Sequence, residues 1–497
     1  MIHLVYTLFV GLLSFLTRRY LHDDPTVDLG YAKYRGNLTS PNVVTYLGIP
    51  YAQPPVGDLR FRAPVPLNTS GTSTEVIDAT EYPDFCIMCS TGAAGDVGGA
   101  GSEDCLKLNI YARADAKEGS KLPVLFYIHG GGYIAGNPAA WPFEHWIEQS
   151  PNVVIVSVYY RLDSLGFLST PEFAEDSSLG DLNAGLLDQR EALRWVQKYI
   201  VKFGGDPSRV TINGESAGAA SDLDAKAYTI ARSVAPDEDL FHSAIAQSVY
   251  RTPLPTPSQQ KVILLPYRTF HPVLDSNIIS EYPTKLITEG KFVQVPLIVG
   301  ATSNETLAFG GTIQEALKSY FPALTDGDVY PEDDFPSEME RALTVTGESS
   351  LRCARTIMGE AFSQTVATWT YRYNQPDPSS NSTLANHAAE NWMMFRGSVF
   401  GPNGTFTFTS QSEPQLAFAE ELIAYWMSFV RARDPNVYKL ERSPEWPKYS
   451  SEERLRMVLQ AGSEGLMSSS GSSVELEGKE ETKRCGCVAK LADRQQA

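Results

Sequence analysis

Residues 210–220 constrain the fold more than any other stretch. The β-branched run Val210-Thr211-Ile212 leads into Gly214-Glu215-Ser216-Ala217-Gly218, and small residues follow. Gly-x-Ser-x-Gly after a strand is typical of a sharp strand-to-helix turn that strains the serine backbone and exposes its hydroxyl. The following helix start offers unpaired N–H groups and a positive dipole end, which favour developing negative charge. The stretch therefore predicts a nucleophilic Ser216, with a chance match to a short pattern as the alternative.

Apolar runs and helical periodicity surround this turn. Short continuous apolar or β-branched runs are typical of strands buried on both faces of a parallel sheet. Apolar residues at three-, four- or seven-residue steps predict amphipathic helices. The predicted strands are 43–49, 124–128, 153–158, 210–213 and 295–299, and the predicted helices are 181–203 and 413–431. Strands that alternate with helices in this way predict an α/β fold with a mostly parallel, doubly wound central sheet.

Three consecutive glycines follow the predicted strand 124–128. Packing alone does not explain three consecutive glycines in His129-Gly130-Gly131-Gly132-Tyr133. Glycines allow backbone N–H groups to face a ligand, as stabilisation of an oxyanion requires. A plain flexible turn is the alternative.

A serine nucleophile needs a base and an acidic group that orients the base. Of the seven histidines, His387 lies late in the chain, between a Pro/Ser/Asn-rich loop and a helix-like run. Glu305 follows the strand 295–299, at the carboxyl end where sites collect. The chain order serine, acid, histidine favours these two residues, with solvated loop positions as the alternative. His145, His242 and His271 have apolar neighbours and are interpreted as structural.

Charge and the N-terminus indicate an exported protein. A net charge of −18 argues against nucleic acid and anionic membrane surfaces as partners. Residues 3–16 are mostly apolar but too short to span a bilayer, so residues 1–20 are predicted to be a signal peptide of a secreted protein with no stable membrane span. An N-terminal anchor is the alternative, because Arg18 and Arg19 follow the apolar stretch. Sequons for N-glycosylation agree with export: Asn37, Asn68, Asn381 and Asn403.

The six cysteines match no zinc pattern, and an exported chain favours disulfides. We expect no metal and no cofactor. Residues 91–102 are rich in Gly and Ala, which predicts a mobile loop. Beyond residue 460 the chain becomes polar, so residues 461–497 are predicted to be a mobile tail.

Several motifs together resemble the type B carboxylesterase/lipase family, and secreted fungal members resemble the chain most. The motifs are Gly48-Ile49-Pro50-Tyr51-Ala52, Ser102-Glu103-Asp104-Cys105-Leu106, His129-Gly130-Gly131-Gly132, Gly185-Leu186-Leu187-Asp188-Gln189, Phe203-Gly204-Gly205-Asp206-Pro207 and Gly214-Glu215-Ser216-Ala217-Gly218. The resemblance spans residues 26–460 and implies an α/β-hydrolase catalytic domain.

The resemblance also assigns roles. It implies Ser216 as nucleophile, Glu305 as triad acid and His387 as base. Gly131, Gly132 and Ala217 would supply the oxyanion-hole N–H groups. Cys86–Cys105 is similar to the family's first disulfide, and Cys353 could pair with Cys485. For Cys89 and Cys487 the resemblance implies no partner.

The chain departs from the family in two places. The segment 249–269 is shorter than in other members, where helices wall the acyl pocket, and residues 91–102 contain no aromatic residue, which argues against choline esters. We expect hydrolysis of carboxylic esters, small-molecule or lipid, through an acyl-enzyme. A lipase acting on longer-chain esters, or a non-catalytic binding protein of the same fold, is the alternative. The oligomeric state remains open.

Overall fold

The structure is a computed structural model of the chain. It describes residues 25–491 apart from 92–93, 222–237, 252–253, 264–269, 306–328, 332–334, 381 and 463–469. The predicted signal peptide (1–20) and the sequon at Asn381 lie outside these residues. Within them, no helix combines the length and the apolar character that crossing a membrane requires.

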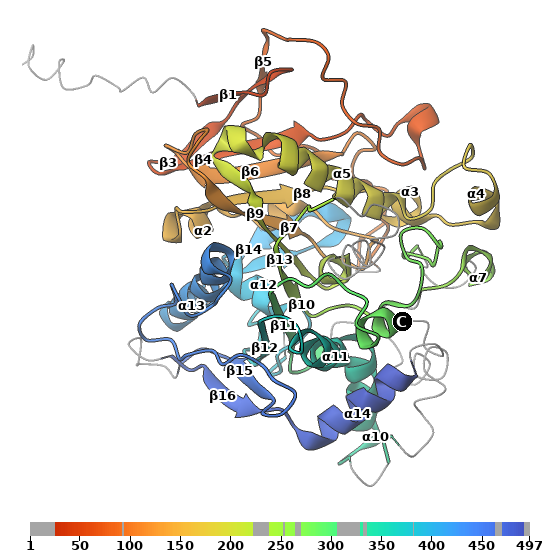
Figure 1. The fold of residues 1–497 in the computed structure, drawn as a ribbon, viewed down its shortest axis with the longest axis vertical. Coiled ribbons are helices and arrows are strands. Elements are labelled where there is room, and N and C mark those ends of the chain that lie inside the picture. Colours follow the sequence, from red (N-terminus) through yellow and green to blue (C-terminus); the bar gives the residue numbers. More distant parts are fainter. Residues whose placement is uncertain are drawn as a thin grey trace, which may run out of the picture.

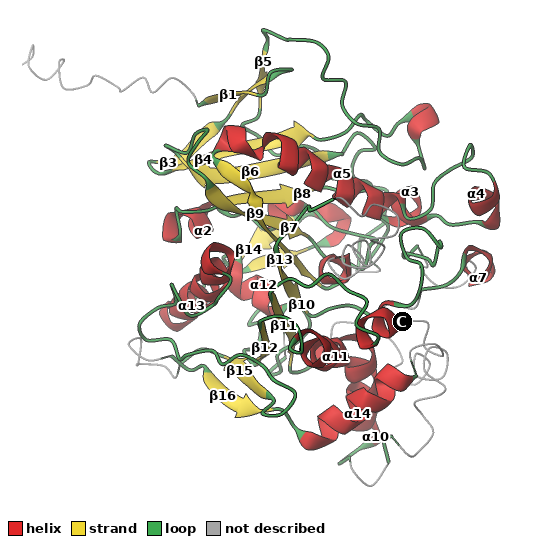
Figure 2. Ribbon diagram, viewed as in Figure 1, coloured by secondary structure: helices red, strands yellow, loops and turns green. Residues whose placement is uncertain are grey.

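A large twisted sheet runs through the molecule (Figures 1 and 2). Its strand order is β16-β15-β12-β11-β10-β9-β7-β8-β6-β4-β3. The strands from β8 to β15 in this order are parallel, whereas β16, β6, β4 and β3 pair antiparallel with their neighbours. The strands of this sheet are β3 (Asn37–Ser40), β4 (Val43–Pro50), β6 (Lys107–Arg113), β7 (Leu122–Ile128), β8 (Val154–Val158), β9 (Gly205–Glu215), β10 (Ser243–Gln247), β11 (Leu297–Thr302), β12 (Thr368–Tyr373), β15 (Leu455–Leu459) and β16 (Ser473–Leu476). The predicted mostly parallel α/β architecture is confirmed.

Two smaller sheets and a set of helices complete the fold. The small sheets are β1 (Thr26–Asp28), β2 (Lys33–Arg35) and β5 (Val76–Asp78), and β13 (Ser398–Phe400) with β14 (Phe406–Phe408). The α-helices are α2 (Glu144–Gln149), α3 (Asp163–Phe167), α4 (Pro171–Glu175), α5 (Ala184–Tyr199), α7 (Pro257–Ile263), α8 (Pro283–Thr288), α10 (Glu338–Gly347), α11 (Cys353–Phe362), α12 (Ala389–Met394), α13 (Glu413–Ala432) and α14 (Lys479–Lys490).

Strand β7 shows why the central strands have no polar face. Successive side chains of a strand point to opposite faces of the sheet. Phe126 belongs to one buried cluster, which includes Leu193 of α5, whereas Tyr127 belongs to a second cluster with Trp426 of α13. Each fully buried side chain of this kind stabilises the fold by about 1.5–3 kcal/mol. In Figure 1, α5 lies in front of the upper part of the sheet, whereas α13 lies beside its lower part.

The predicted helix 181–203 begins and ends slightly differently in the structure. Helix α5 begins at Ala184, and a short 3-10 segment, η3 (Ile200–Phe203), continues it to Gly204. Gly204 ends the segment with φ +86°, a conformation that glycine adopts without strain.

The C-terminal region corrects one expectation. Residues 473–490 are not a mobile tail, because β16 pairs with β15 and a disulfide joins Cys485 of α14 to Cys353 of α11. The Glu481 carboxylate also accepts hydrogen bonds from Arg355 at 2.6 Å and Arg456 at 3.0 Å. A polar segment can therefore be docked when its charges find buried partners of opposite sign.

The loop closed by the Cys86–Cys105 disulfide is cross-linked along its length. The Met88 N–H donates to Ala100 O, and the Ser102 N–H donates to Phe85 O. The tip is attached to another part of the chain, because the Asn403 side chain accepts from Val97 N and donates to Gly95 O. Asn403 lies in the 3-10 turn η7 (Pro402–Gly404), between β13 and β14.

The shortened segment after Ser248 is packed where the structure describes it. Val249 and Leu254 are 1% and 2% exposed. Asn183, just before α5, exchanges two hydrogen bonds with the backbone of Val273 at 2.8 and 2.9 Å. These contacts attach both ends of the segment to the body of the protein.

Candidate active site

Ser216 follows β9 in a left-handed conformation with φ +57°, which costs energy for a residue with a Cβ atom. The glycines on either side make this turn possible. A Cβ atom on Gly214 would lie 2.4 Å from the backbone of Gly218, and one on Gly218 would lie 2.1 Å from Ile128 O. The Ser216 N–H donates to Gln247 O at 2.9 Å, which attaches the turn to the end of β10. The predicted sharp turn is therefore present.

The structure brings Ser216, His387 and Glu305 together. His387 Nε2 lies 2.8 Å from Ser216 Oγ, and His387 Nδ1 lies 2.6 Å from Glu305 Oε2. Glu305 is fully buried, and its second carboxylate oxygen accepts from the Thr302 N–H at 2.6 Å. The three residues form one hydrogen-bonded chain that can move a proton from the hydroxyl to the imidazole.

Their positions follow from the sheet. Strands β9, β11 and β12 lie in the same half of the parallel sheet, and Ser216, Glu305 and His387 come after their respective carboxyl ends. A β-bridge between Asn304 and Asn386 holds the two loops that carry the acid and the histidine. The carboxyl edge of a parallel sheet is where sites collect.

The glycine turn lies against the serine. A Cβ atom on Gly130 would be 3.0 Å from Ser216 Cβ, and one on Gly131 would be 1.9 Å from Ala135 O. Gly131 has φ +102° and Gly132 has φ +63°. The loop's own hydrogen bonds use Gly131 O, which accepts from Ile134 and Ala135.

The backbone around this turn keeps three N–H groups available. In the described part of the chain, no backbone carbonyl pairs with the N–H of Gly131, Gly132 or Ala217. Ala217 is the first residue of the helix that follows the serine, so its N–H is unpaired within that helix. The arrangement is suited to bind an oxygen that becomes negatively charged.

Two buried carboxylates close to His387 were missed by the sequence analysis. Glu215 Oε1 lies 3.3 Å from His387 Nε2, so it faces the same nitrogen as Ser216. Glu390 Oε1 accepts from Tyr371 OH at 3.3 Å and from Ser248 Oγ at 3.4 Å. Glu215 belongs to the Gly-x-Ser-x-Gly motif, and Glu390 lies three residues after His387; these positions are the only signal the sequence offers.

Burial and charge shift the pKa values of this cluster. Burial raises the pKa of Glu215 to about 7 and that of Glu390 to about 8. Burial alone would lower the pKa of His387, but the nearby carboxylates of Glu215 and Glu305 raise it to about 9.

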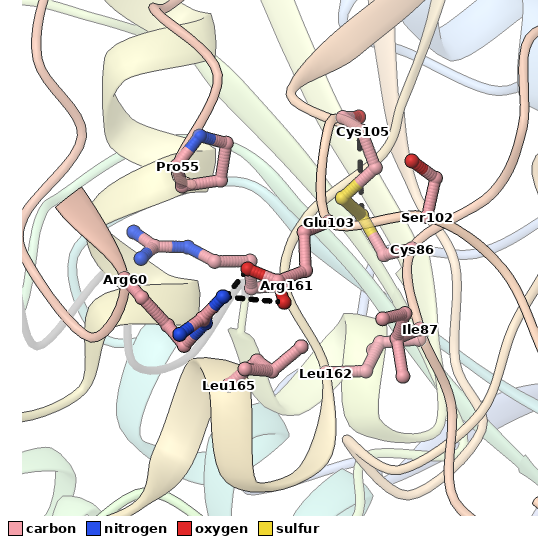
Figure 3. A pocket seen from close by; sticks show the side chains of 10 residues that line it. All are labelled: Pro55, Arg60, Cys86, Ile87, Ser102, Glu103, Cys105, Arg161, Leu162 and Leu165. Carbon is pink, nitrogen blue, oxygen red and sulfur yellow. Dashed lines mark hydrogen bonds and ion pairs between the residues drawn. A yellow bond between two sulfur atoms is a disulfide. The ribbon is translucent and has the colours of Figure 1, made fainter. Parts of the chain in front are cut away.

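The pocket in Figure 3 lies apart from this cluster, beside the Cys86–Cys105 disulfide. Its walls include Pro55, Leu165 and the Arg60–Glu103 ion pair, whose shortest contact is 2.8 Å. None of its lining residues belongs to the serine–histidine–glutamate chain or to the glycine turn, so we assign it no role. Among the described residues, no group of three or more His, Cys, Asp or Glu side chains could hold a metal ion.

The chain is similar to known esterases. A model of the carboxylesterase family matches residues 23–263 and 311–477. Cocaine esterase of Homo sapiens is 30% identical over 496 residues, which cover 84% of each protein. Secreted lipase 1 of Botryotinia fuckeliana (strain B05.10) is 28% identical over 506 residues, covering 82% of this chain and 84% of the lipase.

Solved structures agree with the sequence comparisons. The crystal structure of EstA from Aspergillus niger has a TM-score of 0.78 and 28% identity, and the match covers 95% of this chain and 99% of EstA. The fold is therefore that of the α/β-hydrolase esterases. Since the family model matches most of the chain, the protein belongs to the carboxylesterase family and is a serine-dependent carboxylic ester hydrolase.

Proposed function

We propose that Ser216, His387 and Glu305 are the catalytic triad of this hydrolase. The observation that carries the proposal is the pair of hydrogen bonds in series, 2.8 Å from serine to histidine and 2.6 Å from histidine to glutamate. His387 takes the Ser216 proton as the hydroxyl attacks the ester carbonyl, and it then protonates the leaving alcohol. Water activated by His387 afterwards cleaves the acyl-enzyme. Glu305 holds the imidazole in the required tautomer and stabilises the imidazolium.

The N–H groups of Gly131, Gly132 and Ala217 are proposed to hold the charge of the tetrahedral intermediate. They lie on two neighbouring segments, the glycine turn and the helix start after Ser216, whose backbone N–H groups would be in place before the charge develops. Removal of a single such donor typically lowers the rate by about 10²–10³-fold.

The first prediction concerns the nucleophile. Ser216→Ala should abolish ester turnover and leave the melting temperature nearly unchanged, because only a hydroxyl is lost. Turnover of a nitrophenyl ester and labelling by a serine-directed phosphonate, located by peptide mass spectrometry, are the measurements. Label on another residue, or an active alanine variant, would contradict the assignment. A wild-type protein that binds esters without turnover would support the non-catalytic alternative.

The second prediction concerns the substrate. We propose dissolved short-chain esters, because the loop closed by Cys86–Cys105 is short, rich in glycine and pinned at its tip by Asn403, and so offers little amphipathic cover to open. Rates on a nitrophenyl ester series should be highest for short acyl chains and should not rise sharply above the solubility limit. A strong increase at the oil–water interface would instead indicate a lipase.

Export is also a proposal. Residues 1–20 are proposed as a cleaved signal peptide before a catalytic domain at 26–460, and Asn37 and Asn68 as glycan acceptors, since both residues are exposed. A secreted lipase among the relatives agrees with this reading. N-terminal sequencing and glycopeptide mass spectrometry of the protein from a eukaryotic host test it; an intact N-terminus would favour the anchor.

A further inference from the structure

We propose that His129 is a positioning residue that aims the Gly131 N–H at the oxyanion site. The proposal rests on the proposed function. Among the described residues, no hydrogen bond joins His129 to Ser216, so His129 would act through the glycine turn alone.

The argument begins with one peptide unit. His129 Nδ1 lies 2.8 Å from Gly130 O. A carbonyl oxygen can only accept, so Nδ1 carries the hydrogen and donates. The Gly130 carbonyl and the Gly131 N–H belong to the same planar trans peptide and point in opposite directions. A hydrogen bond that fixes the carbonyl therefore fixes the direction of the Gly131 N–H.

Two aromatic rings stack on the imidazole of His129. Its centroid lies 4.5 Å from that of Tyr160 and 5.9 Å from that of Trp141, and both pairs are stacked. Trp141 stacks in turn on Phe400 of β13 at 5.8 Å. His129 is 2% exposed, so the ring has little freedom to rotate away from the carbonyl.

The turn is also shaped around the ring. A Cβ atom on Gly136 would lie 2.2 Å from His129 Nδ1 and Cε1, so only a glycine at this position leaves room for the imidazole. Tyr160 OH donates to His129 O at 2.8 Å, which fixes the preceding peptide as well. Burial lowers the pKa of His129 to about 4, so the ring stays neutral and keeps one N–H across the pH range in which the enzyme is assayed.

Two variants separate the donor from the ring. His129→Phe keeps an aromatic ring in the stack but loses the N–H, whereas His129→Asn can donate to the same carbonyl but loses the ring. A matched control is His145→Phe. His145 is a partly buried histidine whose pKa burial lowers to about 4, and its Nε2 lies 2.7 Å from Met394 O, a carbonyl that does not belong to the glycine turn.

We expect His129→Phe to lower kcat by about 10–100-fold with little change in KM, because an oxyanion donor acts mainly in the transition state. His129→Asn should recover at least part of that loss. His145→Phe should stay within about threefold of the wild type. A wild-type kcat in His129→Phe, a loss confined to KM, no recovery in His129→Asn, or an equal loss in His145→Phe would each overturn the proposal.

A readout independent of catalysis accompanies the kinetics. Amide hydrogen exchange of the peptide spanning 129–136, followed by mass spectrometry, should accelerate in His129→Phe and not in His145→Phe. Unchanged exchange would overturn the proposal even if activity fell.

Ser216→Ala is measured in parallel. An active Ser216→Ala would refute the proposed triad, while the exchange result still decides whether His129 orders the turn. If His129→Phe does not fold, His129→Leu, which also lacks a donor, takes its place: lower kcat and faster exchange than in His129→Asn are expected, and behaviour equal to that of His129→Asn would overturn the proposal.

Discussion

Two oxygen atoms lie close to one nitrogen of His387. Its Nε2 lies 2.8 Å from Ser216 Oγ and 3.3 Å from Glu215 Oε1. A protonated imidazole can donate to the Glu215 carboxylate, and in that state it cannot act as a base. The raised pKa of Glu215, about 7, means that the carboxyl holds a proton over part of the neutral range, which removes the charge that favours the imidazolium. The charge on Glu215 therefore affects the pKa of His387, the proposed base.

This gives a prediction about pH. Glu215→Gln removes a negative charge beside the imidazole, so the pKa of His387 should fall and neutral, active histidine should persist to lower pH. An opposite charge at this range shifts a pKa by about 1–3 units, so the acidic limb of kcat/KM should move down by about that amount. Profiles from pH 5 to 9 measure it. Glu452→Gln, which changes an exposed carboxylate, is the control, and a limb that does not move would contradict the role of Glu215.

At the scale of elements, the loop closed by Cys86–Cys105 and the hairpin of β13 and β14 are joined near the glycine turn. The Cys89 N–H donates to Ile134 O at 2.9 Å, which connects the loop to the turn at its base. Asn403 connects the tip through Gly95 and Val97. Asn137 Nδ2 donates to Gly404 O at 3.0 Å, so the hairpin is attached to the same region. The loop is thus held at both ends by elements that also shape the site.

Asn403→Ala should free the tip of this loop. Both side-chain hydrogen bonds are lost, so amide exchange over residues 94–102 should accelerate, while the triad remains intact and turnover of a small acetate ester changes by less than about threefold. Hydrogen exchange and nitrophenyl acetate kinetics are the measurements. Asn42→Ala, at an exposed position outside the sequons, is the control. Equal exchange in the two variants would show that Asn403 does not hold the loop.

Across the whole molecule, the features that could be predicted from the sequence are those that a short segment encodes by itself. Apolar runs indicated the strands because burial on both faces leaves no polar positions, as in β7. The turn at Ser216 was predictable because its glycines are steric requirements of one short motif. The burial of Glu215 and Glu390 could not be predicted, since a carboxylate carries no local sign that it will be enclosed. The docking of α14 depends on partners 126 residues apart in the case of Arg355 and Glu481, and no local pattern encodes that distance.

The ion pairs of α14 lead to a prediction about acid stability. Although burial opposes ionisation, the Arg355 and Arg456 guanidinium groups hold the pKa of Glu481 well below its ordinary value. A carboxylate with a depressed folded-state pKa contributes stability that is present above its unfolded-state pKa, about 4.3, and is lost as the pH falls further. Glu481→Gln should lower the free energy of unfolding by about 3 kcal/mol at pH 7, since it removes one partner of a buried arginine.

The difference between wild type and Glu481→Gln should then shrink as the protein is acidified. Below about pH 4.3 this difference should fall by about 1.4 kcal/mol per pH unit. In that range the wild-type Glu481 is protonated in the unfolded state but remains ionised in the folded state. Urea unfolding at pH 7, 5, 4 and 3 measures the difference, and the Cys353–Cys485 disulfide keeps α14 attached in both proteins. Glu480→Gln is the matched control, because this neighbouring side chain is 70% exposed and should show almost no difference at any pH. A Glu481→Gln effect that stays constant from pH 7 to 3 would mean that the charge on Glu481 does not stabilise the docked helix.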